Sequence, residues 1–270
     1  VLVGKKPIVF TNNDSAYETA IEFKKNNINP IVLDSRQDSN SEIIKEAKSL
    51  GIDIKFSHVV VAAKGYKKVK SCDIAEISED KQNLNQIKNI ECDCICVSGF
   101  WTPTVHLASQ SGGKTKFKEE IDAFVPDKSK QKEVTLGSAN GVFTLEETLK
   151  TSFDKGFELS KAITNNNNSQ QIPKVSEKKH SKHDKFWCVP LPKGKKYKRF
   201  LDFQNDVAVS DIELAIREGY RSIEHVKRYT TLGMATDQGK TSNLNGLQLV
   251  SNIENKVVPA VGHTTFRPPY

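Results

Sequence analysis

Residues 225–243, in the last quarter of the sequence, are of types that could hold an anionic cofactor. They include the basic, hydroxyl-rich run Lys227-Arg228-Tyr229-Thr230-Thr231, then Gly233, and then the loop Asp237-Gln238-Gly239-Lys240-Thr241-Ser242. Lysine, threonine and backbone N–H groups are the usual means of holding a phosphate at the start of a helix. The stretch therefore predicts a phosphate or cofactor clamp. The upstream glycine of a P-loop is missing, so a capped helix followed by a polar turn remains the alternative interpretation.

A second candidate site is the turn Gly137-Ser138-Ala139-Asn140-Gly141, which precedes a predicted helix over 145–163. Backbone N–H groups at a helix N-terminus point outward and attract phosphate groups. We therefore expect this turn to contact a dinucleotide. A capped helix that binds no ligand is the alternative.

A third turn, Thr11-Asn12-Asn13-Asp14-Ser15-Ala16, stands where a dinucleotide-binding fold carries its glycine-rich fingerprint. The glycines of that fingerprint let the backbone approach the pyrophosphate, and here Thr and Asn side chains would stand in the way. We predict that this site is degenerate and binds no nucleotide. Asp34 lies about twenty residues further on, where such folds place a ribose-binding acid. It is either a remnant of that site or an ordinary surface aspartate.

The elements that must position these residues alternate between strands and helices in the first part of the chain. Strands are predicted at 6–12, 31–34, 52–56 and 59–63, with helices that begin after the capping residues Asp14-Ser15 and Ser41. Such alternation predicts an α/β fold with a parallel sheet. Further along we expect a hairpin over 66–90, a strand at 92–100, and a final strand and turn over 124–141.

The second part of the chain has a different organisation. Residues 164–184 are rich in Asn, Gln, Ser and Lys, cannot bury a core, and are predicted to be a linker. Beyond them we expect strands at 186–190 and 201–204 and a small helical module. Its helices are predicted to start at Ser210, through a capping box with Glu213, and at Ser222 and Ser242.

The five cysteines, at positions 72, 92, 94, 96 and 188, form no CxxC motif. Cys92, Cys94 and Cys96 alternate along an apolar strand and are predicted to share one face. We expect buried thiols in a reducing, cytoplasmic compartment rather than metal ligands. His180 and His183 have no cysteine or carboxylate cluster beside them and predict no zinc site either.

Composition limits the classes of function. The 270 residues carry a net charge of +7, a pI of about 9.0 and a mean hydropathy of −0.51. No run of about 18 apolar residues is present, so no membrane span is predicted. The positive charge raises the question of nucleic acid, but no aromatic-interleaved basic strand or recognition helix accompanies it. We expect no nucleic-acid partner and keep a non-catalytic basic binding module as an alternative.

The motifs of the C-terminal region resemble those of the α subunits of heterotetrameric sarcosine oxidases. The resemblance rests on residues 202–206, 222–231, 233–241 and 264–270, and it continues more loosely upstream. It implies an internal part of such a subunit, with the first glycine-rich turn of the NAD domain before residue 1 and a folate domain after Tyr270. The upstream half is similar to flavoprotein disulfide reductases with two dinucleotide domains, which implies a Rossmann-type fold.

The resemblance also implies an activity. The complete enzyme would demethylate sarcosine oxidatively to glycine, with O2, tetrahydrofolate and formation of H2O2. It would contain β, γ and δ subunits, an FMN shared with the β subunit, and FAD and tetrahydrofolate sites outside this chain. The chain would hold NAD contacts and no catalytic residue, and we do not expect it to be active alone. The α subunit of a related amine, opine or proline dehydrogenase is the alternative.

The C-terminal module is similar to the ferredoxin-like [2Fe–2S] modules of those related dehydrogenases. The cluster cysteines of the dehydrogenases correspond to Asp202, Gln204, Asp237 and Ser242 in this sequence. An iron–sulfur cluster needs thiolates, and none stands at these positions. We therefore expect the module to keep the fold without a cluster, which favours sarcosine oxidase over its relatives.

Carried over residue by residue, the resemblance implies NAD contacts at Ser138, Phe143 and Leu145, where the family more usually has Ala, Leu and Thr. Lysine and arginine would neutralise the FMN phosphate, while hydroxyls and N–H groups orient it. The expected FMN-facing residues are Lys227, Arg228, Thr230, Thr231, Gln238, Gly239, Lys240 and Thr241, with Thr264, Thr265 and Arg267 as an extension.

These inferences divide the chain into four parts. Residues 1–90 are predicted to be a degenerate second dinucleotide domain, and residues 91–163 the C-terminal part of the NAD-binding domain. The linker over 164–184 follows. Residues 185–270 are predicted to be the helical module at the interface of the FMN and the subunits.

Overall fold

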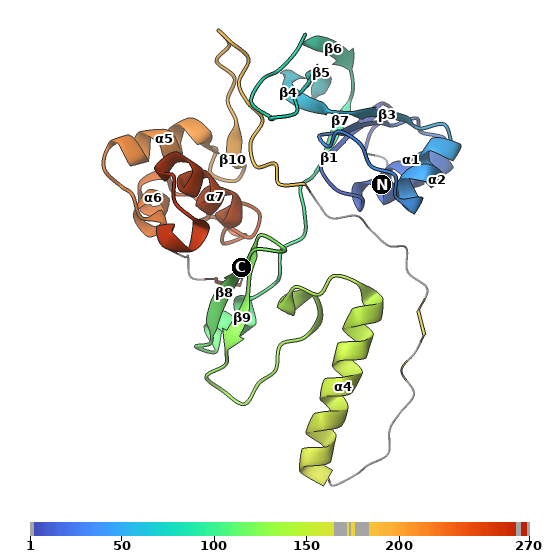
Figure 1. Ribbon diagram of the computed structural model, residues 1–270. Coiled ribbons are helices and arrows are strands. Elements are labelled where there is room, and N and C mark those ends of the chain that lie inside the picture. Colours follow the sequence, from blue (N-terminus) through green and yellow to red (C-terminus); the bar gives the residue numbers. More distant parts are fainter. Residues whose placement is uncertain (1–2, 165–171, 173, 176–183, 263–265, 269–270) are drawn as a thin grey trace. The chain divides into compact units, whose positions relative to one another are not determined.

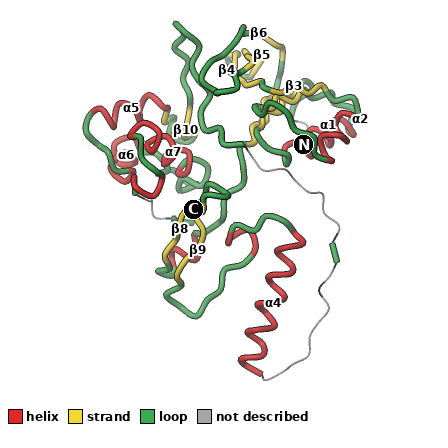
Figure 2. Tube along the Cα trace, viewed as in Figure 1, coloured by secondary structure: helices red, strands yellow, loops and turns green. Residues whose placement is uncertain are grey.

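The computed structural model describes residues 3–164, 172, 174–175, 184–262 and 266–268 (Figures 1 and 2). The chain divides into two compact units. The first consists of residues 1–100 and 178–199, and the second of residues 101–177 and 200–270. Most of the predicted linker lies outside the described residues.

A parallel sheet forms the centre of the first unit. Its strands are β1 (Pro7–Thr11), β2 (Ile31–Asp34), β3 (Asp53–Phe56) and β7 (Cys94–Ser98), in the order β3-β2-β1-β7. All three pairings are parallel, and β1 lies between β2 and β7. The predicted α/β fold with a parallel sheet is therefore confirmed.

Two helices cover one face of this sheet, α1 (Ala16–Lys25) and α2 (Glu42–Ser49), which lie together in Figure 1. Their apolar residues recur at helical spacing and are buried against the strands, as with Tyr17 and Ile44 against Val9 and Val32. Burying side chains of this size stabilises the fold by about 1.5–3 kcal/mol each. The sequence thus places the polar turns at the sheet edge and the apolar residues beneath them.

A small antiparallel sheet covers the opposite face, with strands β4 (His58–Gly65), β5 (Val69–Glu76) and β6 (Lys88–Glu91). It buries Cys72 and Ile74 against Ile8, Leu33 and Cys92. The prediction that Cys92 shares a face with its neighbours is wrong. Cys96 packs on the helix side of the sheet and Cys94 Sγ lies 3.8 Å from Cys96 Sγ, whereas Cys92 precedes β7 and packs beside Cys72.

The second unit begins with α3 (His106–Gln110) and the hairpin of β8 (Lys114–Lys118) and β9 (Ala123–Lys128). The turn η1 (Gly137–Asn140) follows, and then α4 (Leu145–Thr164), in which no residue is buried. The C-terminal part contains the short strands β10 (Phe200–Asp202) and β11 (Val207–Ala208) and four helical segments. These are α5 (Val209–Arg217), α6 (Ile223–Thr230), α7 (Asn243–Glu254) and η2 (Val258–Val261).

One apolar core joins the helical segments to the hairpin within this unit. It contains Ile212, Ile223, Leu232 and Leu247, together with Phe124 of β9. This core holds β10, α6 and the loop before α7 next to one another, and those are the elements that carry the predicted clamp.

Several local predictions differ from the structure. Residues 186–190 form no strand. Helix α5 starts at Val209 rather than after Ser210, and the Asp211 carboxylate, not Glu213, accepts the N–H of Ala208. Helix α1 gains no side-chain cap from Ser15. The compact units also cut the chain differently from the predicted domains, since β7 pairs with β1 and so belongs to the first sheet.

Candidate functional site

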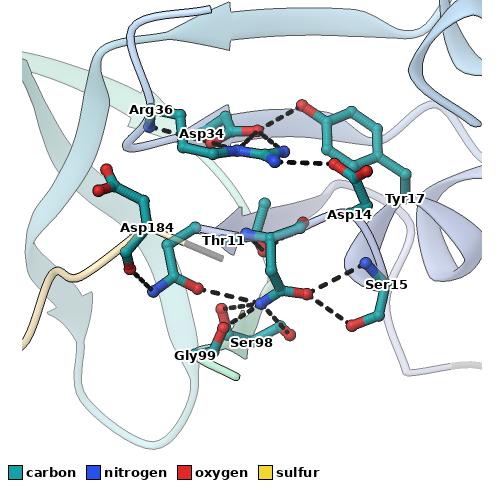
Figure 3. A network of polar contacts seen from close by, with 11 residues as sticks. Thr11, Asp14, Ser15, Tyr17, Asp34, Arg36, Ser98, Gly99 and Asp184 are labelled. Carbon is teal, nitrogen blue, oxygen red and sulfur yellow. Dashed lines mark hydrogen bonds and ion pairs between the residues drawn. The ribbon is translucent and has the colours of Figure 1, made fainter. Parts of the chain in front are cut away.

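The carboxyl ends of β1, β2 and β7 meet at one edge of the first sheet, where open α/β folds bind ligands. Asn13 lies at this edge. Its Nδ2 donates to the backbone oxygen of Gly99 and, at 3.3 Å, to Ser98 Oγ, so the side chain spans the gap between β1 and β7. Asn12 Nδ2 donates to the backbone oxygen of Asp184 at 2.8 Å. The chain's own side chains therefore fill the predicted degenerate turn (Figure 3).

A buried ionic network occupies the rest of this edge (Figure 3). The Arg36 guanidinium lies 2.7 Å from Asp34 Oδ2 and 2.8 Å from Asp14 Oδ1, and Tyr17 donates its hydroxyl to Asp34 at 2.7 Å. Although burial opposes it, the bonds to Asp34 and Asp14 raise the pKa of Arg36. Burial, with Asp34 beside the hydroxyl, raises the pKa of Tyr17. Asp34 is completely buried, so the interpretation as an ordinary surface aspartate is wrong.

The second unit brings together the four residues that the sequence resemblance matched to cluster cysteines. Asp202 is buried and accepts the N–H groups of Gln204 at 2.9 Å and of Gly233 at 2.8 Å. Ser242 Oγ donates to the same carboxylate at 3.5 Å. Gln204 Oε1 accepts the N–H of Asp237 at 3.4 Å, which completes a hydrogen-bonded group of all four residues.

The loop before α7 is closed by Asp237. Its carboxylate accepts the N–H of Gly239 at 3.0 Å, the N–H of Thr241 at 3.3 Å and the hydroxyl of Thr241 at 2.8 Å. Although partial burial opposes it, these donors lower the pKa of Asp237. The two N–H groups predicted to hold a phosphate are therefore bonded to a carboxylate of the chain.

Asn243 explains why this loop contains glycines. Gly233 and Gly239 have φ values of +65° and +75°, and a Cβ on either one would lie 2.2 Å from Asn243 Oδ1. Asn243 Nδ2 donates to the backbone oxygen of Gln238 at 3.2 Å. The glycines make room for this side chain, which fixes the loop against α7.

The predicted FMN-facing residues fall into two groups. Most residues of the first group are hydrogen-bonded to nearby parts of the chain: Thr230 Oγ1 donates to the backbone oxygen of Val226 at 2.8 Å, and Gln238 Nε2 donates to that of Ala235 at 2.8 Å. Gly239 and Thr241 are bonded to Asp237, as described above. Thr231 ends α6 in the left-handed conformation with its side chain exposed.

The second group is the cationic triad, Lys227, Arg228 and Lys240, and none of these residues forms an ion pair within the described part of the chain. Lys227 is partly buried. Burial lowers the pKa of Lys227, Glu224 opposes this, and the positive charge of Arg267 lowers the pKa further. Lys227 and Arg267 are thus close enough for their positive charges to interact, and neither forms an ion pair with a described carboxylate. Thr264 and Thr265 lie outside the described residues.

The predicted NAD contacts lie on the surface of the second unit. Ser138 is exposed in the η1 turn, and Phe143 and Leu145 are 39% and 51% exposed. The turn ends at Gly141, whose φ is +77°, and a Cβ there would lie 2.7 Å from Ile121 Cδ1. The glycine therefore serves the packing of the turn, while the three predicted contacts remain open to a ligand.

One residue of interest, His106, escaped the sequence reasoning. It lines a small cleft in the second unit together with Lys240 and Phe266. Burial lowers the pKa of His106, and Lys240 lowers it further. Its place in the sequence, one residue after a turn containing Pro103, carries no signal of this, because the neighbours are brought to it from more than a hundred residues away.

Within the described ranges, no group of three or more His, Cys, Asp or Glu residues is placed to hold a metal ion. Of the helices in the described part of the chain, none has the length and apolar character that crossing a membrane requires.

The parallel sheet, with helices on one face and a small sheet on the other, defines an α/β protein with a Rossmann-like fold. The same fold occurs in an L-proline dehydrogenase from P. horikoshii, with a TM-score of 0.59 over 98% of this chain and 48% of that one, at 18% identity. This similarity concerns the fold alone.

The sequence comparisons are more specific about the family than the similarity in fold. Residues 196–270 match the family model described as the sarcosine oxidase A3 domain. The whole chain is 33% identical to the sarcosine oxidase α subunit of Rhizobium meliloti and 31% identical to that of a Corynebacterium species, and it covers 26% and 28% of their lengths. The chain is therefore a homologue of sarcosine oxidase α subunits, which confirms the resemblance, and it spans about a quarter of the relatives it matches.

Proposed function

We propose that this chain is part of the α subunit of a heterotetrameric sarcosine oxidase, in which it contributes NAD contacts and one wall of an FMN site shared with the β subunit. The FAD that oxidises sarcosine and the tetrahydrofolate site lie outside this chain. Similarity along the whole chain to α subunits that carry this name supports the proposal.

The cationic triad carries the FMN part of the proposal. A flavin phosphate is a dianion, and it binds where positive side chains are not already paired. Lys227, Arg228 and Lys240 meet that condition in the described part of the chain, whereas the loop amides of Gly239 and Thr241 do not. The FMN wall is therefore made by long cationic side chains. The hydroxyl and amide groups of Thr230, Gln238 and Thr241 shape the backbone that presents them.

We also propose that the helical module is ferredoxin-like and holds no cluster. An iron–sulfur cluster needs thiolate ligands, and the four corresponding positions carry Asp202, Gln204, Asp237 and Ser242. These side chains bond to one another and to backbone N–H groups, so they do not fit a cluster. In this proposal the network replaces the cluster as the centre of the module.

The NAD part rests on the exposed corner formed by Ser138, Phe143 and Leu145. Two apolar side chains and one hydroxyl could contact the cofactor there. The remainder of an NAD site, including a glycine-rich turn, would come from residues outside this chain.

The decisive experiment measures cofactor content in the full α chain co-expressed with its β partner. The variant Lys227→Ala/Arg228→Ala/Lys240→Ala should lose FMN and keep FAD and NAD, because only the phosphate counter-charges are removed. The matched control, Lys193→Ala/Lys195→Ala/Lys196→Ala, removes the same charge from exposed lysines elsewhere and should keep all three cofactors. If the first variant retained FMN at unchanged affinity, the assignment of these three residues to the FMN wall would be wrong.

The α subunit of a related amine, opine or proline dehydrogenase is the second candidate. Iron analysis of the purified complex separates the two. If the complex contains stoichiometric iron and the variant Asp202→Ala retains it, the iron belongs to a cluster outside the module. That result would favour the dehydrogenase class.

A further inference from the structure

A small cleft in the second unit shares Lys240 with the proposed FMN wall and is otherwise lined by residues that the wall does not use. Residues from four segments line it: 102–106, β9, the loop and helix over 239–247, and Phe266. Its walls are mostly apolar, with Phe124, Leu247 and Phe266 among them. The cleft has a volume of about 40 Å³, which is room for about three water molecules. It can take a small molecule or the end of a larger one, and not a flavin ring.

His106 is the unusual member of this lining. Its side chain is 92% buried, since only 8% of the residue is exposed, and it makes no hydrogen bond to any described residue. Its ring contacts Phe266 edge to face, with the centroids 6.1 Å apart. A buried imidazole normally has at least one bonded nitrogen, because an unbonded polar group loses its hydration without compensation. The nitrogen without a partner is the buried Nδ1, and because the residue also lines the cleft, a ligand there would lie against the imidazole ring.

Lys240 supplies a charge next to this imidazole. Its ammonium is exposed, lines the same cleft and has no ion-pair partner among the described residues. Because burial and Lys240 together lower the pKa of His106, the imidazole is neutral near pH 7 and offers one N–H donor. One cation and one neutral donor on the lining of a mostly apolar cleft are complementary to a single negative charge on an apolar body.

We propose that this cleft binds a small organic carboxylate, with the carboxylate between Lys240 and the His106 N–H and the apolar part against Phe124, Leu247 and Phe266. A carboxylate fits better than inorganic phosphate, because a dianion in an apolar cleft would lose more hydration than one lysine can replace. The carboxylate site and the FMN wall share Lys240, whereas His106 belongs to the cleft alone and Lys227 and Arg228 belong to the wall alone.

The test uses calorimetric titration of the full α chain in its complex, with propionate as the probe. Propionate should bind saturably at one site per chain. Propionamide, which has the same shape without the charge, and inorganic phosphate should bind at least tenfold more weakly. The variants His106→Leu and Lys240→Gln should each weaken propionate binding at least tenfold.

Two controls distinguish a specific loss of propionate binding from a general loss of structure and from a loss of FMN. The variant His106→Asn keeps an N–H donor of similar reach and should retain most of the propionate affinity, which a general loss of structure would not allow. The variant Arg228→Gln should weaken FMN retention and leave propionate affinity unchanged, whereas His106→Leu should do the opposite. Absence of saturable propionate binding, or equal affinity in wild type, His106→Leu and Lys240→Gln, would overturn the proposal.

Discussion

The sheet edge of the first unit and the cationic triad of the second are both built from polar residues at places where the sequence raised the question of a cofactor site. At the sheet edge, the charges of Asp14, Asp34 and Arg36 are paired with one another in a fully buried network. In the triad, Lys227 and its neighbours carry positive charge that no described carboxylate pairs. The charged groups at the sheet edge are thus paired with one another, while those of the triad form no ion pair among the described residues.

This difference separates polar groups that the chain itself has paired from polar groups that are available to a ligand. Buried polar groups must be hydrogen-bonded, so a site without a ligand survives only if side chains replace the ligand's contacts. Asn13 and Arg36 do this in the first unit. The three cations of the triad form no ion pair with a described residue, and the proposed FMN wall rests on that property.

The largest effect should come from breaking the sheet-edge network. The variant Arg36→Met leaves the carboxylates of Asp14 and Asp34 buried without their counter-charge, which should lower the free energy of unfolding by about 3–5 kcal/mol. Chemical denaturation of the full chain measures this.

The matched control for Arg36 is Lys55→Met. Lys55 pairs with Asp53 at 3.2 Å at the surface, with 36% and 53% of the two side chains exposed. Its removal should change stability by about 1 kcal/mol or less. Equal effects of the two substitutions would mean that the buried network contributes no more than a surface pair.

The next largest effect should come from Asp202→Ala in the helical module. Gly233 N–H and Gln204 N–H would lose their acceptor, and the buried one would be left unbonded, which should cost about 1–3 kcal/mol. The conservative variant Asp202→Asn keeps one oxygen and should lose less. If Asp202→Ala proved neutral, the network could not be the structural centre of the module.

A smaller effect is expected for Gly239→Ala, because a residue with φ of +75° and a Cβ against the Asn243 amide is strained. The loss should be about 1–2 kcal/mol. In the double variant with Asn243→Ala the clash disappears, so the two losses should not add. A double-mutant cycle in thermal unfolding measures the coupling, and additive losses would contradict the contact.

The smallest effect concerns pH. The pKa of Asp237 in the folded protein lies below its ordinary value of 3.8, so the unfolded chain binds the proton more readily. The contribution to stability is therefore fully present above about pH 4 and is lost as pH falls through the folded pKa. The variant Asp237→Asn should remove this part of the acid dependence. An unchanged stability profile between pH 5 and 2, measured by chemical denaturation, would show that the donors of Gly239 and Thr241 do not favour the ionised form.

Much of the local structure could be predicted because its causes are local. The alternation of apolar runs and capped helices placed β1, α1, β2 and α2 to within a few residues. Predictions failed where a local signal competed with tertiary contacts. Ser210 has the side chain of a good cap, but burial of Val209 starts α5 earlier, and Asp211 satisfies the free N–H instead.

The sequence alone determined the class of the fold, the missing glycines of the turn at Thr11 and the absence of thiols at the four cluster positions, since these depend only on residue type and period. The tertiary structure decided which polar groups are hydrogen-bonded or ion-paired within the chain. Hydrogen bonds between Arg36 and Asp14, 22 positions apart, and between Gly233 and Asp202, 31 positions apart, join residues whose spacing predicts no contact. A charge is available to a ligand only after all its possible partners in the chain are placed, and that is a property of the fold.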